Sequence, residues 1–359
     1  MKLFRCQTCA QLLYFENRQC QRCFHRLGYL PAEAVLSAVE PEDGLWRALA
    51  LPATRYRFCA NAAYDTCNWL VPEDWTEEFC IACRHNRTIP DLEQPENLAR
   101  WRKFELAKHR LFYTLIRLGL PLTSRAEDSR FGLVFDFLSN RSHSGGEEVM
   151  TGHENGLIAI NLAEADDAER EKLRMAMGET YRTLLGHLRH ESGHYFCGRL
   201  VRGTEWIEKF REFFGDERQD YGGALQSYYR NGPPQNWQQR HISAYAAAHP
   251  WEDFAETWAH YLHIVDTLEM AFAFGIHIHP GSAGKEAAPD FDPHDAGSLD
   301  RLIDAWLPLT FGVNSIVRCM GEADFYPFVL SPRTITKMGF IHELVQQKDH
   351  MGIRPSPSP

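Results

Sequence analysis

The chain has 359 residues and a formal net charge of −10 at pH 7, and 44% of its residues are hydrophobic. These values fit a globular protein with one sizeable core and room for a smaller module, and they exclude a largely disordered chain. The acidic balance argues against general binding to nucleic acid or to an anionic membrane, so we expect neither as a partner.

The N-terminal segment shows no apolar leader, because Met1 to Arg5 runs directly into Cys6. The most lipid-like run, Met270–Ile278, is too short to span a bilayer. Eight of the ten cysteines come before residue 84, and six of these form three Cys-x-x-Cys pairs. In a reducing compartment such clustering indicates metal sites rather than disulfides. We therefore expect a cytoplasmic protein.

The cysteines predict one or two structural zinc sites with four thiolate ligands each. The more compact set consists of Cys6, Cys9, Cys20 and Cys23. A second and less regular set, in which only the last two residues have the knuckle spacing, consists of Cys59, Cys67, Cys80 and Cys83. His25 or His85 could replace a sulfur in either set, and unpaired thiols in a small core are the alternative to both sites. Zinc would stabilise a segment that buries little apolar surface by itself.

The pattern along the chain predicts an α+β protein with three parts. A zinc-ribbon module is expected over residues 1–88, and the polar, proline-containing stretch 88–95 is interpreted as a hinge. A mainly helical domain with a small sheet is expected over 89–351, and a disordered tail over 352–359.

Apolar periodicity predicts a first helix over residues 96–118, and strands over 131–137 and 156–162. Residues 142–146 and 151–154, between the two strands, are interpreted as turns. Helices dominate the remainder of the chain. One is predicted from 163 to 174 or beyond, with a break near 178, and the next runs through the segment 190–194 to 201. Further helices are predicted over 205–214, 221–229, 251–268, 298–319 and 332–345.

The most informative segment is His190-Glu191-Ser192-Gly193-His194. On a helix the two histidines share one face and can bind one zinc ion, with Glu191 placed to take a proton from a zinc-bound water. Ser192 and Gly193 are small, which suits a helix packed close to a metal. The alternative is a pair of helix histidines with ordinary hydrogen bonds.

A catalytic zinc ion needs a third protein ligand and an open fourth position. Glu252 and Glu256 are four residues apart, so a helix that starts near Pro250 presents both on one side. We assign Glu252 as the third ligand and Glu256 as the group that bonds the outer nitrogen of a ligand histidine. Asp253 competes for either role, and an acidic first turn that balances the helix dipole is the alternative.

Tyr245 lies seven residues before Glu252 and is predicted to donate a hydrogen bond to the developing oxyanion. The alternative is a buried core tyrosine. His249 either shares this role or caps the following helix. His187 is interpreted as a supporting or packing residue, and Cys197 as a small buried residue.

These residues together predict hydrolysis of a peptide bond. Zinc acidifies its bound water, and Glu191 removes the proton and later gives it to the leaving amine. The strand Leu157–Leu162 is a candidate edge strand on which an extended peptide could lie. The loop 281–297 is a candidate cover for the cleft.

Three segments carry a resemblance to a known family: Tyr181–Tyr195, Ala244–Trp258 and Tyr326–Pro332. With the cysteine pairs, the chain resembles the bacterial family of zinc-binding metallopeptidases with an N-terminal zinc-ribbon domain, whose peptidase domain belongs to the Glu-zincin group. The spacing of Tyr245, Glu252 and Glu256 is also similar to that in the lethal-factor branch of zinc peptidases. That likeness implies that Tyr245 is an oxyanion donor, that Glu252 is a zinc ligand and that Glu256 supports a ligand histidine.

The resemblance implies that residues 89–351 form a zincin-like metallopeptidase domain. It also implies a catalytic zinc ion and a peptide or protein substrate, without naming the substrate. Two other functions stay open. A zinc-ribbon protein with a vestigial hydrolase site would bind a protein partner, since residues 1–88 hold ten Lys/Arg and ten Asp/Glu and lack the basic excess of a nucleic-acid binder. A zinc amidohydrolase acting on a small non-peptide substrate would use the same chemistry.

Overall fold

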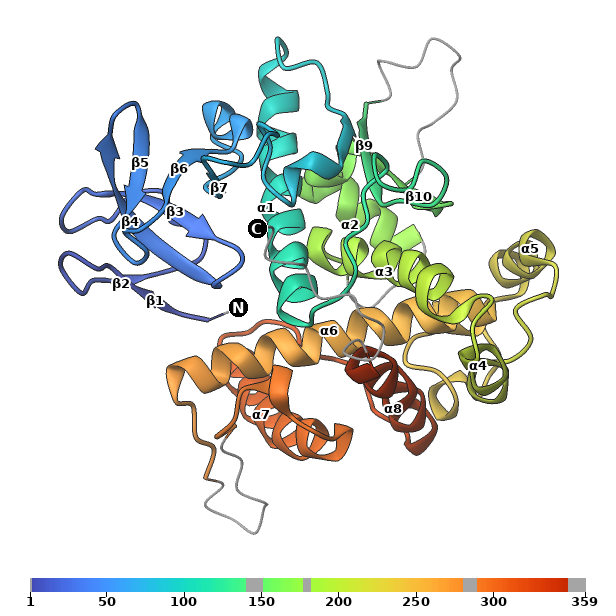
Figure 1. The fold of residues 1–359 in the computed structure, drawn as a ribbon. Coiled ribbons are helices and arrows are strands. Elements are labelled where there is room, and N and C mark those ends of the chain that lie inside the picture. The colour runs from blue at the N-terminus through green and yellow to red at the C-terminus, as the bar shows by residue number, and fades with distance from the viewer. Residues whose placement is uncertain (1, 140–150, 177–181, 280–288, 348–359) are drawn as a thin grey trace. The chain divides into compact units, whose positions relative to one another are not determined.

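The structure is a computed structural model that describes residues 2–139, 151–176, 182–279 and 289–347. Its contacts divide the chain into two compact units, Met1–Glu169 and Arg170–Pro359, and each is described by itself. The first contains the strands and the long helix α1, and the second is helical (Figure 1). The α+β class is confirmed. The boundary predicted at residue 88 lies inside the first unit, and the division at that position stays a prediction.

The first unit begins with a short hairpin and a larger antiparallel sheet. The hairpin pairs β1 (Phe4–Arg5) with β2 (Leu12–Leu13). The sheet has five strands in sequential order: β3 (Arg26–Leu30), β4 (Val35–Glu42), β5 (Leu45–Ala48), β6 (Arg55–Phe58) and β7 (Leu70–Pro72). Its core packs Leu30, Val39, Ala48, Tyr56 and Leu70 together. The sequence analysis predicted no sheet between the two cysteine sets.

The second half of this unit combines helix α1 (Pro95–Arg117) with a mixed sheet. Pro95 occupies the first turn of α1, where the missing N–H costs no helical hydrogen bond. The strand order in the sheet is β10 (Gly152–Glu154), β11 (Leu157–Asn161), β9 (Val134–Leu138) and β8 (Asn86–Thr88).

The sheet corrects two expectations. Strand β11 pairs with β10 on one side and with β9 on the other, so the prediction of an edge strand at Leu157–Leu162 is wrong. Residues 152–154, interpreted as part of a turn, form β10 because they pair with β11. The turn expected over 142–146 lies outside the described residues.

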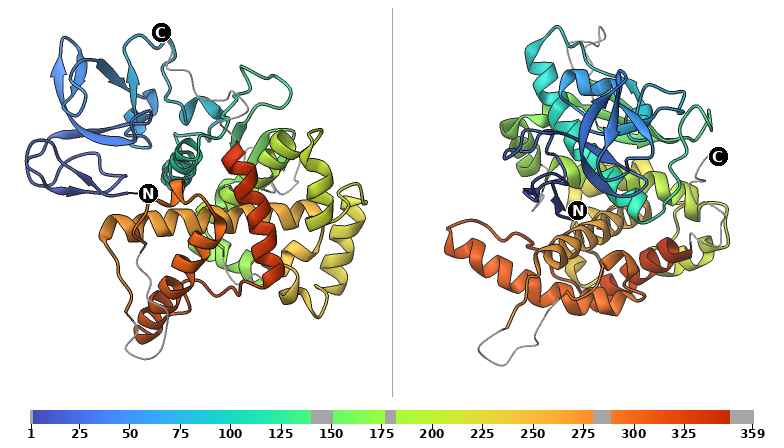
Figure 2. Two further views of the ribbon diagram at one scale, coloured as in Figure 1. Left: turned by 60° about the horizontal axis from the view of Figure 1, so that its bottom comes forward. Right: turned by 60° about the vertical axis from the view of Figure 1, so that its left-hand side comes forward.

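Helix α6 is the centre of the second unit. The helices there are α3 (Leu184–Phe196) with a π-helical turn (Cys197–Val201), α4 (Trp206–Phe214), α5 (Tyr221–Asn231), α6 (Pro250–Phe274), α7 (Leu299–Cys319) and α8 (Pro332–Gln346), while α2 (Asp167–Ala176) spans the division between the units. Helices α3, α4, α7 and α8 all pack on α6, and α8 crosses it (Figure 2). Each helix predicted after residue 184 has a counterpart.

The ends of these helices follow from local sequence. The Thr183 hydroxyl accepts a hydrogen bond from the Gly186 N–H at the start of α3. Helix α6 begins with Pro250 and ends at Gly275, whose φ of 61° is the left-handed conformation that glycine adopts freely. Among the described residues, no helix is both long and apolar enough to cross a lipid bilayer. The predicted tail, 352–359, and much of the loop 281–297 lie outside the described residues.

Candidate metal centres

Helix α3 carries the His-Glu-Ser-Gly-His segment and lies directly against α6. A Cβ atom at Gly193 would stand 2.8 Å from the Cα of Ala255, so the two backbones touch. Beside it, the Trp258 Nε1–H donates to the Ser192 hydroxyl over 3.1 Å. The small residues between the histidines therefore allow the close contact of α3 with α6.

This packing brings three potential ligands together. The Nε2 atom of His190 lies 3.1 Å from the Nε2 atom of His194 and 3.1 Å from Oε2 of Glu252, and the His194 Nε2 atom lies 3.5 Å from Glu252 Oε1. Zinc ligands about 2.0–2.1 Å from a tetrahedral ion are separated by about 3.4 Å. Glu252 is 1% exposed, and its Oε2 atom has no hydrogen-bond partner among the described residues. The donor set therefore fits zinc.

The outer nitrogen of His190 is occupied by Glu256. The His190 Nδ1 atom lies 2.6 Å from Glu256 Oε1, so that Nδ1–H donates and Nε2 is left to face Glu252. Burial works against a charged imidazole, but the neighbouring carboxylates of Glu252 and Glu256 outweigh it and hold the pKa of His190 well above its ordinary value. Two buried carboxylates thus favour a cation at this position.

Glu191 lies beside these atoms and is buried. Its Oε1 atom is 3.3 Å from the His187 Nε2 atom, and its Oε2 atom has no hydrogen-bond partner among the described residues. Burial by itself would raise the pKa of Glu191, but the hydrogen bond from His187 and the neighbouring His190 lower it below the ordinary value. Glu191 is therefore a charged carboxylate with one oxygen near His187 and one buried oxygen that has no hydrogen-bond partner among the described residues.

Two tyrosines complete the site, and the sequence analysis found one of them. The Tyr245 ring lies 6.0 Å from the His190 ring, and burial together with the Glu252 carboxylate raises the Tyr245 pKa, so the phenol keeps its proton. The Tyr221 hydroxyl of α5 donates to Glu252 Oε1 over 2.6 Å. Tyr221 precedes Glu252 by 31 residues, and no spacing rule connects residues so far apart.

The other candidates near this site have separate roles. His249 is the N-cap of α6, since its Nδ1 atom accepts from the Trp251 N–H over 3.1 Å. Asp253 bonds Lys337 and lies 3.1 Å from His241, away from the ligand atoms. Cys197 is buried, which raises its pKa to about 12.

The first cysteine set has the geometry of a metal knuckle. The Sγ atoms of Cys6 and Cys23 are 3.5 Å apart, and those of Cys9 and Cys20 are 3.6 Å apart. The N–H of the residue after each pair, Ala10 or Phe24, donates to the carbonyl of the first cysteine over 2.9 Å. Both residues have φ near +60°, which turns the chain back around the sulfurs.

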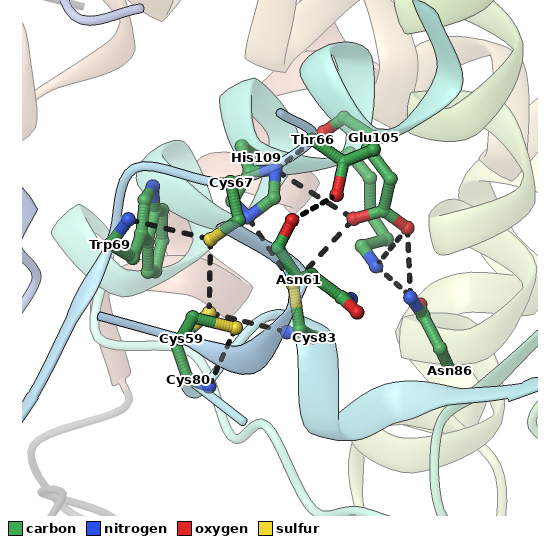
Figure 3. Close-up of polar contacts among 11 residues, drawn as sticks. Cys59, Asn61, Thr66, Cys67, Trp69, Cys80, Cys83, Asn86, Glu105 and His109 are labelled. Atoms are coloured by element: carbon green, nitrogen blue, oxygen red, sulfur yellow. Dashed lines mark hydrogen bonds and ion pairs between the residues drawn. The ribbon is translucent and has the colours of Figure 1, made fainter. Parts of the chain in front are cut away.

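The second cysteine set is fully buried (Figure 3). Its four Sγ atoms lie within 4.8 Å of one another, and those of Cys67 and Cys80 are 3.8 Å apart. Four sulfurs about 2.3 Å from a zinc ion would be separated by about 3.8 Å, so the set fits zinc. His85 instead bonds the Leu133 carbonyl, and His25 lies 3.7 Å from Glu40, so neither replaces a sulfur.

Two family models match the chain. One, described as "Putative zinc-binding metallo-peptidase", covers residues 97–344, and one described as "zinc-ribbon domain" covers residues 3–94. The chain is also similar to uncharacterized proteins of Mycobacterium bovis and of two strains of Mycobacterium tuberculosis. Each is 41% identical over 348 residues, which are 97% of this chain and 96% of the relative. No solved structure matches the chain.

Proposed function

We propose that this chain, which belongs to the family described as "Putative zinc-binding metallo-peptidase", is a zinc-dependent peptidase with its active site on α3 and α6. The family membership and the cysteine clusters support zinc binding in general. The observation that supports the peptidase most directly is the convergence of His190, His194 and Glu252, with the open carboxylate oxygen of Glu191 beside them.

In this proposal His190 Nε2, His194 Nε2 and the Glu252 carboxylate hold the zinc ion. Bound zinc supplies a Lewis acid that polarises a carbonyl group and makes a water molecule more acidic. Glu256 keeps the His190 ring in its orientation, and Tyr221 does the same for the Glu252 carboxylate.

Glu191 serves as the general base and then as the general acid. Because its pKa is lowered, it is ionised at neutral pH and can accept the proton of the attacking water. It then passes this proton to the amine that leaves. His187 bonds one oxygen and leaves the other for the water, so it positions Glu191.

Tyr245 is the proposed donor to the oxyanion. Its buried phenol stays protonated next to Glu252, and a hydrogen bond to the oxygen that becomes negative stabilises the transition state. Peptide-bond cleavage uses this whole set, so the proposed substrate is a peptide or an unfolded protein segment. We further propose that the zinc-ribbon domain recruits a protein partner or the substrate.

The test compares the wild-type chain with Glu191→Gln and Glu252→Gln. Bound zinc is counted by elemental analysis, and cleavage of dye-labelled denatured casein is measured alongside. Glu191→Gln is expected to keep the zinc content of the wild type and to cleave ~10²–10⁴-fold more slowly, because only the proton carrier is lost. Glu252→Gln is expected to bind one zinc fewer and to be inactive.

Equal zinc in Glu252→Gln and wild type would mean that Glu252 is not a ligand. A zinc-loaded wild type that cleaves no polypeptide would contradict the peptidase and favour a hydrolase acting on a smaller amide. Glu208→Gln on α4, whose side chain is largely exposed, is the matched control and is expected to behave as wild type in both measurements.

A further inference from the structure

Cys83 contacts helix α1 as well as the other three cysteines of its set. Its Sγ atom lies 3.6 Å from His109 Nε2 and 3.6 Å from Glu105 Oε2. In Figure 3 both side chains project from α1 toward the cysteine cluster. Cys83, Glu105 and His109 are 1%, 0% and 4% exposed, so water does not separate them. Two side chains of α1 therefore contact the second cysteine set through Cys83.

The His109 ring is fixed so that Nε2 faces the sulfur. Its Nδ1 atom lies 2.6 Å from the Glu105 backbone carbonyl oxygen, which only accepts hydrogen bonds, so Nδ1 is the donor. The ring also packs on the Trp69 ring, with centroids 5.1 Å apart, and the backbone N–H of Trp69 donates to Cys67 Sγ. The Glu105 carbonyl and the Trp69 ring therefore hold the His109 ring in contact with the Cys83 sulfur.

The charge of Glu105 is balanced without a metal. Its Oε1 atom accepts from Lys108 Nζ over 2.8 Å and from Asn86 Nδ2 over 2.8 Å, and Lys108 also bonds Asn86. Because the Lys108 ammonium group is already beside this carboxylate, a separate metal held by Cys83, Glu105 and His109 would be repelled. Asn86 is the first residue of β8, so its hydrogen bonds to Glu105 and Lys108 join helix α1 to the mixed sheet.

We propose that the second cysteine set and His109 form one metal centre, in which the metal bound by the four sulfurs also fastens helix α1 to the segment that carries Cys59, Cys67, Cys80 and Cys83. The four sulfurs occupy all four positions of a tetrahedral ion, so His109 is not a ligand. It is a positioning residue, which holds Cys83 in place by contact with its Sγ atom. The metal therefore joins the region of the zinc-ribbon match (3–94) to the first helix of the metallo-peptidase match (97–344). This inference does not depend on peptidase activity.

The test follows each cysteine separately while zinc is withdrawn from the full-length chain with a chelator. Alkylation of the individual thiols is read by peptide mass spectrometry. In His109→Ala, the thiols of the second set are expected to become reactive at ~10–100-fold higher free zinc than in wild type. The first set, Cys6 to Cys23, is an internal control and is expected to be unchanged. His109→Gln, which keeps a polar side chain that can pack against Cys83, is expected to restore part of the affinity.

Thr114→Ala is the matched variant for a general weakening of α1, because Thr114 is buried on the same helix and its hydroxyl donates to the Arg110 carbonyl. It is expected to leave both zinc midpoints at the wild-type value. An unchanged midpoint of the second set in His109→Ala, or an equal shift in Thr114→Ala, would overturn the proposal.

A second measurement needs no variant. Amide hydrogen exchange of residues 104–112 in the wild type is followed during the same zinc withdrawal. Protection of this part of α1 is expected to fall as the second set loses its metal. If α1 stays equally protected after Cys59, Cys67, Cys80 and Cys83 have all become reactive, the metal does not fasten the helix and the proposal fails.

Discussion

Gly193 of α3 and Ala255 of α6 are in backbone contact: a Cβ atom at position 193 would lie 2.8 Å from the Ala255 Cα atom and 3.2 Å from its carbonyl oxygen. This contact sets the distance between the two helices that carry the metal donors. His194 follows Gly193 directly, and Glu252 lies one turn before Ala255. The proposed zinc site thus depends on the absence of a side chain at Gly193.

Replacing Gly193 by alanine is expected to lower the free energy of unfolding by about 1–3 kcal/mol, because backbone atoms must move to accept the methyl group. The same movement separates His194 from Glu252, so zinc is also expected to be held less tightly. Chemical denaturation and zinc titration measure the two effects. Gly198→Ala is the control, since a Cβ atom there meets nothing within 4 Å. Equal stability of the two variants would contradict this account.

Tyr221→Phe removes the hydrogen bond that orients the Glu252 carboxylate. The affinity for the proposed zinc ion at His190, His194 and Glu252 is expected to fall ~10–100-fold, as is typical when a group that orients a ligand is lost. The fold is expected to persist, since Tyr221 is only partly buried. Competition with a chromophoric chelator gives the affinity. Tyr64→Phe, at an exposed position of the first unit, is the control, and a matching affinity in both variants would remove Tyr221 from the site.

Tyr245→Phe tests the oxyanion donor. If the phenol bonds the substrate oxygen only in the transition state, kcat should fall ~10²–10³-fold while KM and zinc content stay close to wild type. Steady-state kinetics on the best peptide found for the wild type provides both constants. A variant with wild-type kcat would make Tyr245 a packing residue.

The local signals in the sequence predicted helices well because their causes are local. His249 and Pro250 mark the start of α6, and the histidine spacing places two donors on one face of α3, whereas the predicted end of α6 at 268 falls short of its end at Phe274. By contrast, β10 and the five-stranded sheet depend on pairing with other strands. Residues 152–154 read as a turn from their own composition, and only β11 makes them a strand.

The same distinction applies to the candidate site. Its proposed ligands lie in two segments. The spacing of four residues between His190 and His194, and between Glu252 and Glu256, indicates in each case one face of a helix. Tyr221 contacts Glu252 at a sequence separation of 31 residues. His109 contacts Cys83 at a sequence separation of 26 residues. Neither residue belongs to a motif, so each becomes visible only when α5 or α1 is placed in the fold. The sequence therefore predicted the proposed ligands of the metals but not the residues that orient them.

His342 of α8 makes the stability of the second unit depend on pH. It is 5% exposed, and its Nδ1 atom lies 3.0 Å from the Tyr261 hydroxyl. Burial lowers its pKa below the ordinary value, although the neighbouring Glu343 and a hydrogen bond to the Gly297 backbone work in the opposite direction. The folded protein therefore keeps His342 neutral at pH values at which the unfolded chain binds a proton.

Because the unfolded state takes up this proton below about pH 6.5, the contribution of His342 is fully present above that pH and is lost as the pH falls through it. The loss is at most about 1.4 kcal/mol per pH unit. His342→Gln cannot take up the proton, so its stability should fall less steeply between pH 6.5 and 5 than that of wild type. Denaturant unfolding at fixed zinc concentration measures both slopes. Parallel slopes would mean that His342 binds its proton equally well in the folded protein.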